Sequence, residues 1–269
     1  MEAALLALGG LAAGVFGALL GLGGGILLVP MLTLVFGLPL TTAVGTSLVS
    51  VVATSTGAAA HNVRERRADV RLGITLAMGT VVGAISGGML AGVLSERALA
   101  GLFAALLAYT ALSMGRSLLS GRGRSDGGAP VDPAAPDGPH EPEYRRHRLP
   151  AALGGSFVAG NVSGLLGVGG GVVTVPLIHL VQRAPMHVAV ATSNFMIGIT
   201  AAAGAYAYLF RGDVDPAIAG PVVVGVAGGA AVGARLLGRV RAVWLSVLFL
   251  GVLGYTAIQM GLRALELGR

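Results

Sequence analysis

The first apolar run of the chain, AALLALGGLAAGVFGALLGLGGGILLVPMLTLVF, covers residues 3–36 and decides the fold class. It carries no charged residue, yet four glycines within residues 21–25 interrupt it. About 20 consecutive apolar residues are enough to cross the hydrocarbon core of a bilayer as a helix. The run is continuously apolar rather than alternating, which excludes the pattern of a barrel strand. We therefore predict an all-α polytopic membrane protein.

The composition of the whole chain favours the same class. Apolar residues make up 54% of the 269 residues and charged residues only 11%, whereas soluble domains carry about 25% charged residues. The net charge of +6 comes from Arg alone, and because the Arg clusters flank apolar spans we attribute them to topology rather than to nucleic-acid binding. The chain has no Cys, which excludes disulfides and thiolate metal sites. No basic region precedes the first run, so residues 3–20 are expected to belong to the mature fold.

An internal repeat with a separation of 146 residues relates the two halves of the chain. Pro30 aligns with Pro176, and the register holds without a gap from Gly21 to Gly115. Other aligned pairs are Pro39 with Pro185, Asp69 with Asp215, and Tyr109 with Tyr255. Chance matches of Gly are common in such a composition, but chance matches of Pro, Asp and Tyr in one register are not. The register therefore predicts a duplication.

The duplication divides the chain into a first membrane repeat over residues 1–115, a flexible hydrophilic linker over 116–149, and a second membrane repeat over 150–269. The linker is rich in Arg, Gly, Pro and Asp and has almost nothing to bury. Each repeat begins with a broken apolar run, which three further spans follow. We expect these spans at about 40–60, 73–94 and 98–115 in the first half and at about 187–210, 217–238 and 242–262 in the second.

The placement of Arg predicts that the halves have opposite orientations. The basic loop His61–Arg71 and the Arg-rich linker are two spans apart, so both can be cytoplasmic. In the second half the Arg cluster at 235–241 falls opposite the nearly neutral turn Leu94–Arg97. Inversion requires an odd number of crossings in each half, and the simplest route is for each glycine break to fold its run into a hairpin of two short helices that dips into the membrane. Eight plain spans with parallel halves are the alternative.

The glycine cluster is the candidate binding segment of each half. Residues 21–25 run into Val29-Pro30, and their copy at 167–171 runs into Val175-Pro176. Glycine disfavours helix, and irregular backbone at membrane depth is tolerated only where protein buries it or where it lines a cavity. Broken helices in repeated halves are a common plan of transporter sites, and their amino-terminal N–H groups favour an anion. The alternative is close helix packing through small residues.

A hydroxyl-rich segment follows each break. Gly45-Thr46-Ser47-Leu48 recurs as Ala191-Thr192-Ser193-Asn194. Hydroxyl and amide groups can donate to an oxyanion without the cost of a buried charge. The alternative is that these side chains bond to carbonyl groups of their own helix.

These motifs carry a family resemblance. The glycine-rich segment leading into Val-Pro, the Pro that follows, the Gly/Ala-Thr-Ser segment and the basic loop after His61 resemble the sulfite exporter TauE/SafE family. The resemblance covers both halves and leaves out the linker. It implies a permease of the cytoplasmic membrane for sulfur-containing or related organic anions, such as sulfite, sulfoacetate or other sulfonates. The chain departs from the family where Val70 follows Asp69 and Pro216 follows Asp215, because the family often has an aromatic residue there.

The sequence thus predicts a secondary permease that is no enzyme and needs no metal or cofactor. Its expected partners are a small anion and the lipid bilayer, without nucleic acid, and a homo-oligomer is compatible with it. An anion channel and a non-transporting scaffold are the alternatives. The predicted substrate-binding residues are Gly21, Gly23, Gly24, Gly25, Thr46, Ser47, Gly167, Gly169, Gly170, Gly171, Thr192, Ser193 and Asn194. His179 and His61 are candidate proton or gating groups, although a structural, hydrogen-bonded role for His179 is the alternative.

Overall fold

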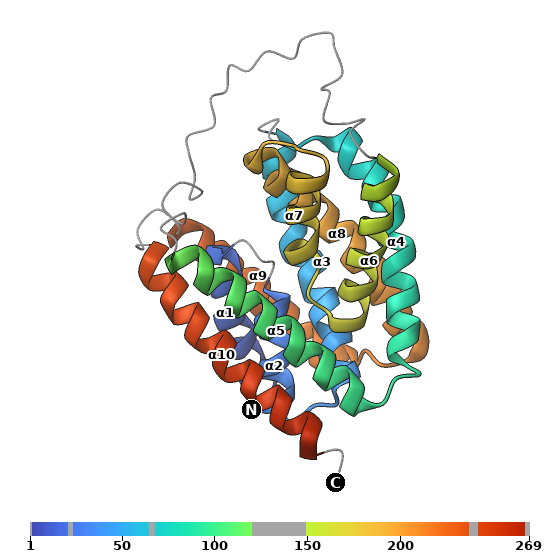
Figure 1. The fold of residues 1–269 in the computed structure, drawn as a ribbon. Helices are drawn as coiled ribbons and strands as arrows, with labels where there is room; N and C mark the ends of the chain where they lie inside the picture. The colour runs from blue at the N-terminus through green and yellow to red at the C-terminus, as the bar shows by residue number, and fades with distance from the viewer. Residues whose placement is uncertain (1, 21–23, 65–67, 120–148, 237–241, 267–269) are drawn as a thin grey trace.

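The computed structural model describes residues 2–20, 24–64, 68–119, 149–236 and 242–266, and these are helical with no strand among them. The all-α fold class is therefore confirmed. The first half holds α1 (Glu2–Leu20), α2 (Gly25–Leu34), α3 (Leu40–Arg64), α4 (Val70–Ala91) and α5 (Glu96–Leu119). The second half holds α6 (Leu149–Leu166), α7 (Gly171–Pro176), the π-helix η3 (Leu177–Val181), α8 (Met186–Arg211), α9 (Pro216–Leu236) and α10 (Ala242–Glu266) (Figure 1).

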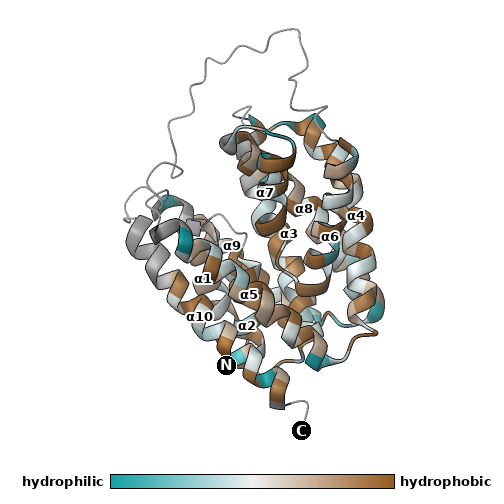
Figure 2. Ribbon diagram, in the orientation of Figure 1, coloured by the Kyte–Doolittle hydropathy of each residue, from teal (hydrophilic) through white to brown (hydrophobic). Residues whose placement is uncertain are grey.

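Five of the described helices are long and apolar enough to cross a membrane. They are Val70–Ala91, Glu96–Arg116, Leu149–Leu166, Val188–Arg211 and Pro216–Gly233. Large apolar side chains such as those of Met78, Val224 and Phe210 are exposed on the outside of the bundle. Figure 2 shows hydrophilic residues mostly at helix ends and apolar residues along the helices between them. This distribution fits a lipid-facing surface, because an apolar exterior is stable only where water is absent.

Each glycine break separates a long helix from a short one. α1 has 19 residues and α6 has 18, whereas α2 has 10 and α7 has 6 before it passes into η3. The sequence predicted a pair of short helices at each break, but α1 has almost the length of a membrane span and α6 is one of the five candidate spans. The reason is that each glycine cluster lies near the middle of a long run, so 18 residues (3–20) in the first run and 17 (150–166) in the second can propagate as helix before it.

Two reciprocal interfaces join the halves through glycine. α1 packs on α9, and α4 packs on α6. A Cβ atom built at Gly229 on α9 would lie 2.1 Å from the carbonyl oxygen of Leu11, and one built at Gly83 on α4 would lie 2.1 Å from that of Phe157. In the 146-residue register Gly83 is equivalent to Gly229, and Phe157 is equivalent to Leu11. The two contacts are therefore equivalent. The glycines at these interfaces thus allow backbone-to-backbone packing of the kind seen between membrane helices.

The centre of the molecule is the crossing of α3 and α8, which occupy equivalent places in the two halves. Gly45 lies against Tyr208, Leu48 against Gly204, and Ser55 against Gly198. As the residue number rises on α3 it falls on α8, so the two equivalent helices run antiparallel.

The two ends of the molecule differ in what they carry. The terminal end holds the start of α3, the α4–α5 turn, the α8–α9 loop and the last turn of α10 (Figure 1). The opposite end holds the end of α3, the start of α4 and the start of α8. The end of α3 and its 146-residue equivalent, the end of α8, therefore lie at opposite ends of the molecule.

Candidate functional site

The two glycine breaks meet in the interior of the protein. A Cβ atom built at Gly25 would lie 2.5 Å from the carbonyl oxygen of Gly167, so the two segments touch through their backbones. The side chain of Val51 on α3 packs against Gly25 and Gly169, and that of Ile197 on α8 packs against Gly169 and Gly171. A Cβ atom at any of these glycines would lie within 3.1 Å of Val51 or Ile197. Val51 and Ile197 are themselves 146 residues apart, so the arrangement is nearly the same on both sides of the crossing.

The breaks need glycine for backbone conformation as well as for space. Gly24 and Gly170 precede α2 and α7 with φ of 78° each, and Gly167 and Gly169 also have positive φ. This left-handed region costs an L side chain about 1–2 kcal/mol. The nearest atom to a Cβ built at Gly24 is 3.5 Å away, so conformation rather than crowding requires glycine there. Gly21 and Gly23, two of the predicted site residues, lie outside the described residues.

The predicted hydroxyl groups are buried and hold the breaks in place. Ser47 Oγ donates to the carbonyl oxygen of Gly167 at 2.8 Å and lies 3.4 Å from that of Gly25. Ser193 Oγ lies 2.6 Å from Thr174 Oγ1, and Thr174 Oγ1 donates to the carbonyl oxygen of Gly170 at 3.0 Å. Both serines therefore act across segments, directly or through Thr174. They do not bond back into their own helices, which was the alternative that the sequence left open.

The two threonines of the hydroxyl segments differ. Thr192 Oγ1 accepts a hydrogen bond from the backbone N–H of Asp69 at 2.9 Å, which joins α8 to the start of α4. Thr46 Oγ1 is fully buried and has no hydrogen-bond partner among the described residues. A buried hydroxyl without a partner is costly, and among the four predicted hydroxyls only that of Thr46 has its hydrogen-bonding capacity unused within the described residues.

The remaining predicted residues lie apart from the crossing or are half-buried near it. Asn194 is half-buried on α8 next to Ser193. His179 is exposed on η3, and its Nδ1 lies 2.9 Å from the carbonyl oxygen of Ala184, which requires the proton on Nδ1. The exposed position and this bond match the structural alternative considered for His179. His61 lies in α3, and its side chain is outside the described residues.

Sequence reasoning missed three kinds of residue at the crossing. Val51 and Ile197 could have been found, because they occupy one position of the 146-residue register. Thr174 carried a weaker signal, since its equivalent in the first half is Leu28. Tyr208 is fully buried and donates from its hydroxyl to the carbonyl oxygen of Leu165 at 3.2 Å. No pattern in the sequence places Tyr208 beside the second break, because Tyr208 and Leu165 are 43 residues apart and lie on different helices.

Comparison with known proteins connects this geometry to a family. The sulfite exporter TauE/SafE family matches residues 6–260, which is nearly the whole chain. The chain belongs to the TauE/SafE family. With its helical fold and five candidate spans, this TauE/SafE protein is a multi-pass membrane protein.

Two curated relatives of this TauE/SafE protein are similar over most of their length. The probable membrane transporter protein YunE of Bacillus subtilis is 28% identical over 252 residues, which cover 88% of this chain and 89% of the relative. The probable membrane transporter protein MJ0441 of Methanocaldococcus jannaschii is 28% identical over 211 residues, which cover 76% of this chain and 72% of the relative. No solved structure matches the chain.

Proposed function

We propose that this protein is a secondary permease that moves small sulfur-containing or organic anions, such as sulfite or sulfonates, across the cytoplasmic membrane. The observation that carries the proposal is the contact between the two equivalent glycine breaks at the crossing of α3 and α8, inside a TauE/SafE fold. The names of the two relatives as probable membrane transporters support it.

The crossing has the groups that an anion site needs. Short helices begin at Gly25 and Gly171, and the first N–H groups of a helix have no acceptor within it. Within the described residues, Thr46 adds an unpartnered hydroxyl. Ser47 can exchange its backbone partner Gly167 for a ligand, and Ser193 can exchange the hydroxyl of Thr174. Asp69 is a buried acidic residue beside Thr192, and its carboxylate accepts a hydrogen bond from the N–H of Leu72 as the cap of α4. All these residues are buried, so we assign this conformation to a closed state of the permease.

The arrangement of the halves supports an alternating-access mechanism. α3 and α8 run antiparallel, and each glycine interface has a counterpart in the other half. This geometry supports the inverted arrangement that the Arg distribution predicts. In such transporters one repeat rocks against the other around a fixed central site.

The proposal is tested by transport into proteoliposomes. We expect saturable uptake and efflux of labelled sulfite, sulfate or sulfoacetate. Flux that does not saturate would indicate a channel instead. Reconstituted protein that is folded but moves none of these anions would refute the permease and favour a scaffold.

The orientation of the halves can be measured with cysteine labelling, because the native chain has no Cys. Arg71 and Ala217 are equivalent in the 146-residue register, and both are exposed at the start of a helix. In intact cells we expect Arg71→Cys to react only with a permeant reagent and Ala217→Cys to react with an impermeant one. Ser95→Cys, at the terminal end, should behave like Ala217→Cys. Labelling of positions 71 and 217 from one side would contradict inversion.

We predict a moderate effect for Ser47→Ala. The substitution removes one hydroxyl, which contributes about 0.5–1.5 kcal/mol to a neutral acceptor and up to about 3 kcal/mol to a charged one. Anion affinity should therefore fall by a few-fold to about a hundredfold, measured by calorimetry on monodisperse protein. Ser113→Ala is the matched control, because Ser113 Oγ bonds to Thr110 in its own helix, away from the crossing. Equal affinities for Ser47→Ala and wild type would remove Ser47 from the site.

A further inference from the structure

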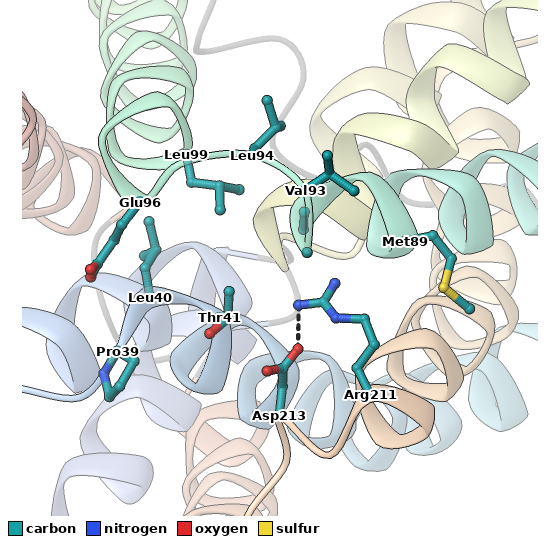
Figure 3. A pocket seen from close by; sticks show the side chains of 12 residues that line it. Pro39, Leu40, Thr41, Met89, Val93, Leu94, Glu96, Leu99, Arg211 and Asp213 are labelled. Atoms are coloured by element: carbon teal, nitrogen blue, oxygen red, sulfur yellow. Dashed lines mark ion pairs between the residues drawn. The ribbon is translucent and has the colours of Figure 1, made fainter.

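A second feature, separate from the crossing, lies at the terminal end of the molecule. A cavity of about 580 Å³ opens between the start of α3, the α4–α5 turn and the end of α8 (Figure 3). Most of its lining residues are apolar, and its charged side chains are Glu96, Arg211 and Asp213. Glu96 Oε1 lies 3.1 Å from Arg263 Nη2, and Figure 3 shows the Glu96 carboxylate pointing away from Arg211. Arg211 and Asp213 are therefore the charges that face each other in this cavity.

Arg211 is held by three contacts. Its Nη2 forms an ion pair with Asp213 Oδ2, its Nη1 donates to the carbonyl oxygen of Gly88 on α4, and its guanidinium carbon lies 4.9 Å from the centre of the Tyr208 ring. Only 18% of the Arg211 side chain and 25% of the Asp213 side chain are exposed. A guanidinium has five N–H donors, and these contacts occupy two of its nitrogens. The Arg211 side chain is thus fixed in place while part of its donor set remains available.

The turn after α8 puts Asp213 beside Arg211. Gly212 adopts φ of 77°, its N–H donates to Leu209, and the N–H of Asp213 donates to Tyr208. This pair of bonds is the Schellman motif, which reverses the chain at a helix end. The Asp213 carboxylate therefore occupies the place on Arg211 where an external oxyanion would bind.

Tyr208 connects this cavity to the crossing. Its ring lies under the Arg211 guanidinium, and its hydroxyl donates to Leu165, two residues before Gly167. A Cβ atom built at Gly45 of α3 would lie 3.1 Å from Tyr208 Cβ. Arg211 is accordingly one packed side chain away from the second glycine break.

We propose that this cavity is an anion-binding vestibule in which the Arg211 guanidinium binds the oxyanion group of sulfite or a sulfonate by displacing the Asp213 carboxylate. The inference rests on the proposed permease function and adds a first binding position on the route to the crossing. The planar fork of Arg matches two oxygens of such a group. The displaced Asp213 carboxylate gives up its partner and has to turn toward solvent, to which 25% of its side chain is already exposed. The apolar walls provide space for the organic part of a sulfonate.

The vestibule can be tested without transport, through the reactivity of a cysteine placed in it. Val93 lines the cavity and is 85% exposed, so Val93→Cys should react with small methanethiosulfonate reagents. We compare the rate with an anionic sulfonatoethyl reagent against the rate with a cationic trimethylammonium reagent. Relative to Leu265→Cys, which is 65% exposed on α10 outside this cavity, Val93→Cys should favour the anionic reagent. Sulfoacetate should slow labelling at position 93 and not at position 265.

Two substitutions should move this preference in opposite directions. Arg211→Gln should abolish it and weaken sulfoacetate binding about ten- to a hundredfold, as expected for the loss of a charged donor. Asp213→Asn should strengthen both the preference for the anionic reagent and the affinity for sulfoacetate, because it removes the competing charge and keeps Arg211. Arg97→Gln is the matched control, since Arg97 is an exposed Arg at the same end that does not line the cavity; it should leave both values unchanged.

The outcomes separate this inference from the permease proposal. Folded Asp213→Asn protein with wild-type reagent preference and wild-type affinity overturns the vestibule, and this holds even if Arg211→Gln does not fold. If the wild-type protein transports anions and Arg211→Gln leaves reagent preference and sulfoacetate affinity unchanged, the vestibule is overturned while the permease stands. A preference that follows Arg211 in protein that transports no anion supports the vestibule and refutes the permease.

Discussion

Gly24→Val and Gly170→Val are expected to abolish anion transport while the protein remains folded in the membrane. Both glycines have φ of 78° immediately before a short helix of the crossing. A β-branched side chain is strained in this conformation, and the relaxed backbone would turn the first N–H groups of α2 or α7 away from the shared site. Transport in proteoliposomes and anion binding on monodisperse protein measure the effect.

Gly37→Val is the matched control for this strain. Gly37 has φ of 66° in the loop between α2 and α3, and nothing lies within 4 Å of a Cβ built there. It therefore carries a similar conformational cost, about 1–2 kcal/mol or more for a branched side chain, away from the crossing. Transport should survive in Gly37→Val. If folded Gly24→Val and Gly170→Val proteins bind and transport anions like wild type, the site lies elsewhere. If these two variants misfold while Gly37→Val folds, the glycines serve packing.

The largest effect on stability is expected for Gly229→Leu. A Cβ atom at this position of α9 would lie 2.1 Å from the carbonyl oxygen of Leu11 on α1, and backbone atoms of a packed helix cannot move aside cheaply. Overpacking of a core typically costs about 1–3 kcal/mol, and separating two helices over a whole glycine interface costs more. We expect loss of monodisperse protein in size-exclusion chromatography.

Gly228→Leu is the control for Gly229→Leu. Gly228 precedes Gly229 on the same helix, yet nothing lies within 4 Å of a Cβ built there. Because Leu is favoured over Gly within a helix by roughly 0.5–1 kcal/mol, this variant should fold as well as wild type or slightly better. Similar behaviour of the two variants would show that α1 and α9 do not pack as described. The equivalent substitution Gly83→Leu on α4 should resemble Gly229→Leu, because its Cβ would meet Phe157 at the same distance.

Much of the fold could be predicted from local sequence because the bilayer restricts the choices. An apolar segment in lipid has to satisfy its backbone hydrogen bonds internally, so residues 70–91 and 216–236 form helices close to the predicted spans. The four glycines of residues 21–25 predict a break whatever surrounds them. The breaks could therefore be placed without knowing their neighbours. The prediction of a flexible linker falls mostly on residues 120–148, outside the described residues, although α5 extends four residues past the predicted boundary, to Leu119.

The candidate site was predicted only in part, and the hydroxyl groups show why. Thr46, Ser47, Thr192 and Ser193 were selected for their chemistry, and the structure places them at or beside the crossing. The hydrogen-bond partner of each hydroxyl depends on residues far away in the chain. Ser47, for example, donates to the carbonyl oxygen of Gly167, 120 residues later. The sequence left Thr46 and Thr192 as equivalents, whereas only Thr192 has an N–H partner, on Asp69. The proposal that these groups bind an anion remains a prediction.

The sequence by itself determined that the chain is helical, apolar and broken by glycine at two places, and it predicted a duplication, because each property depends on residues within one segment or on one fixed offset. The tertiary structure alone decided that the two breaks touch, that Gly83 and Gly229 face carbonyl groups of another helix, and that Arg211 meets Asp213 in a cavity. Arg211 had no sign of importance in the sequence, since its charge matters only where α3, α4 and α8 converge. The physical reason is that hydrogen bonding within a helix is local, whereas cavities, ion pairs and close backbone contacts arise between segments that the order of residues does not place together.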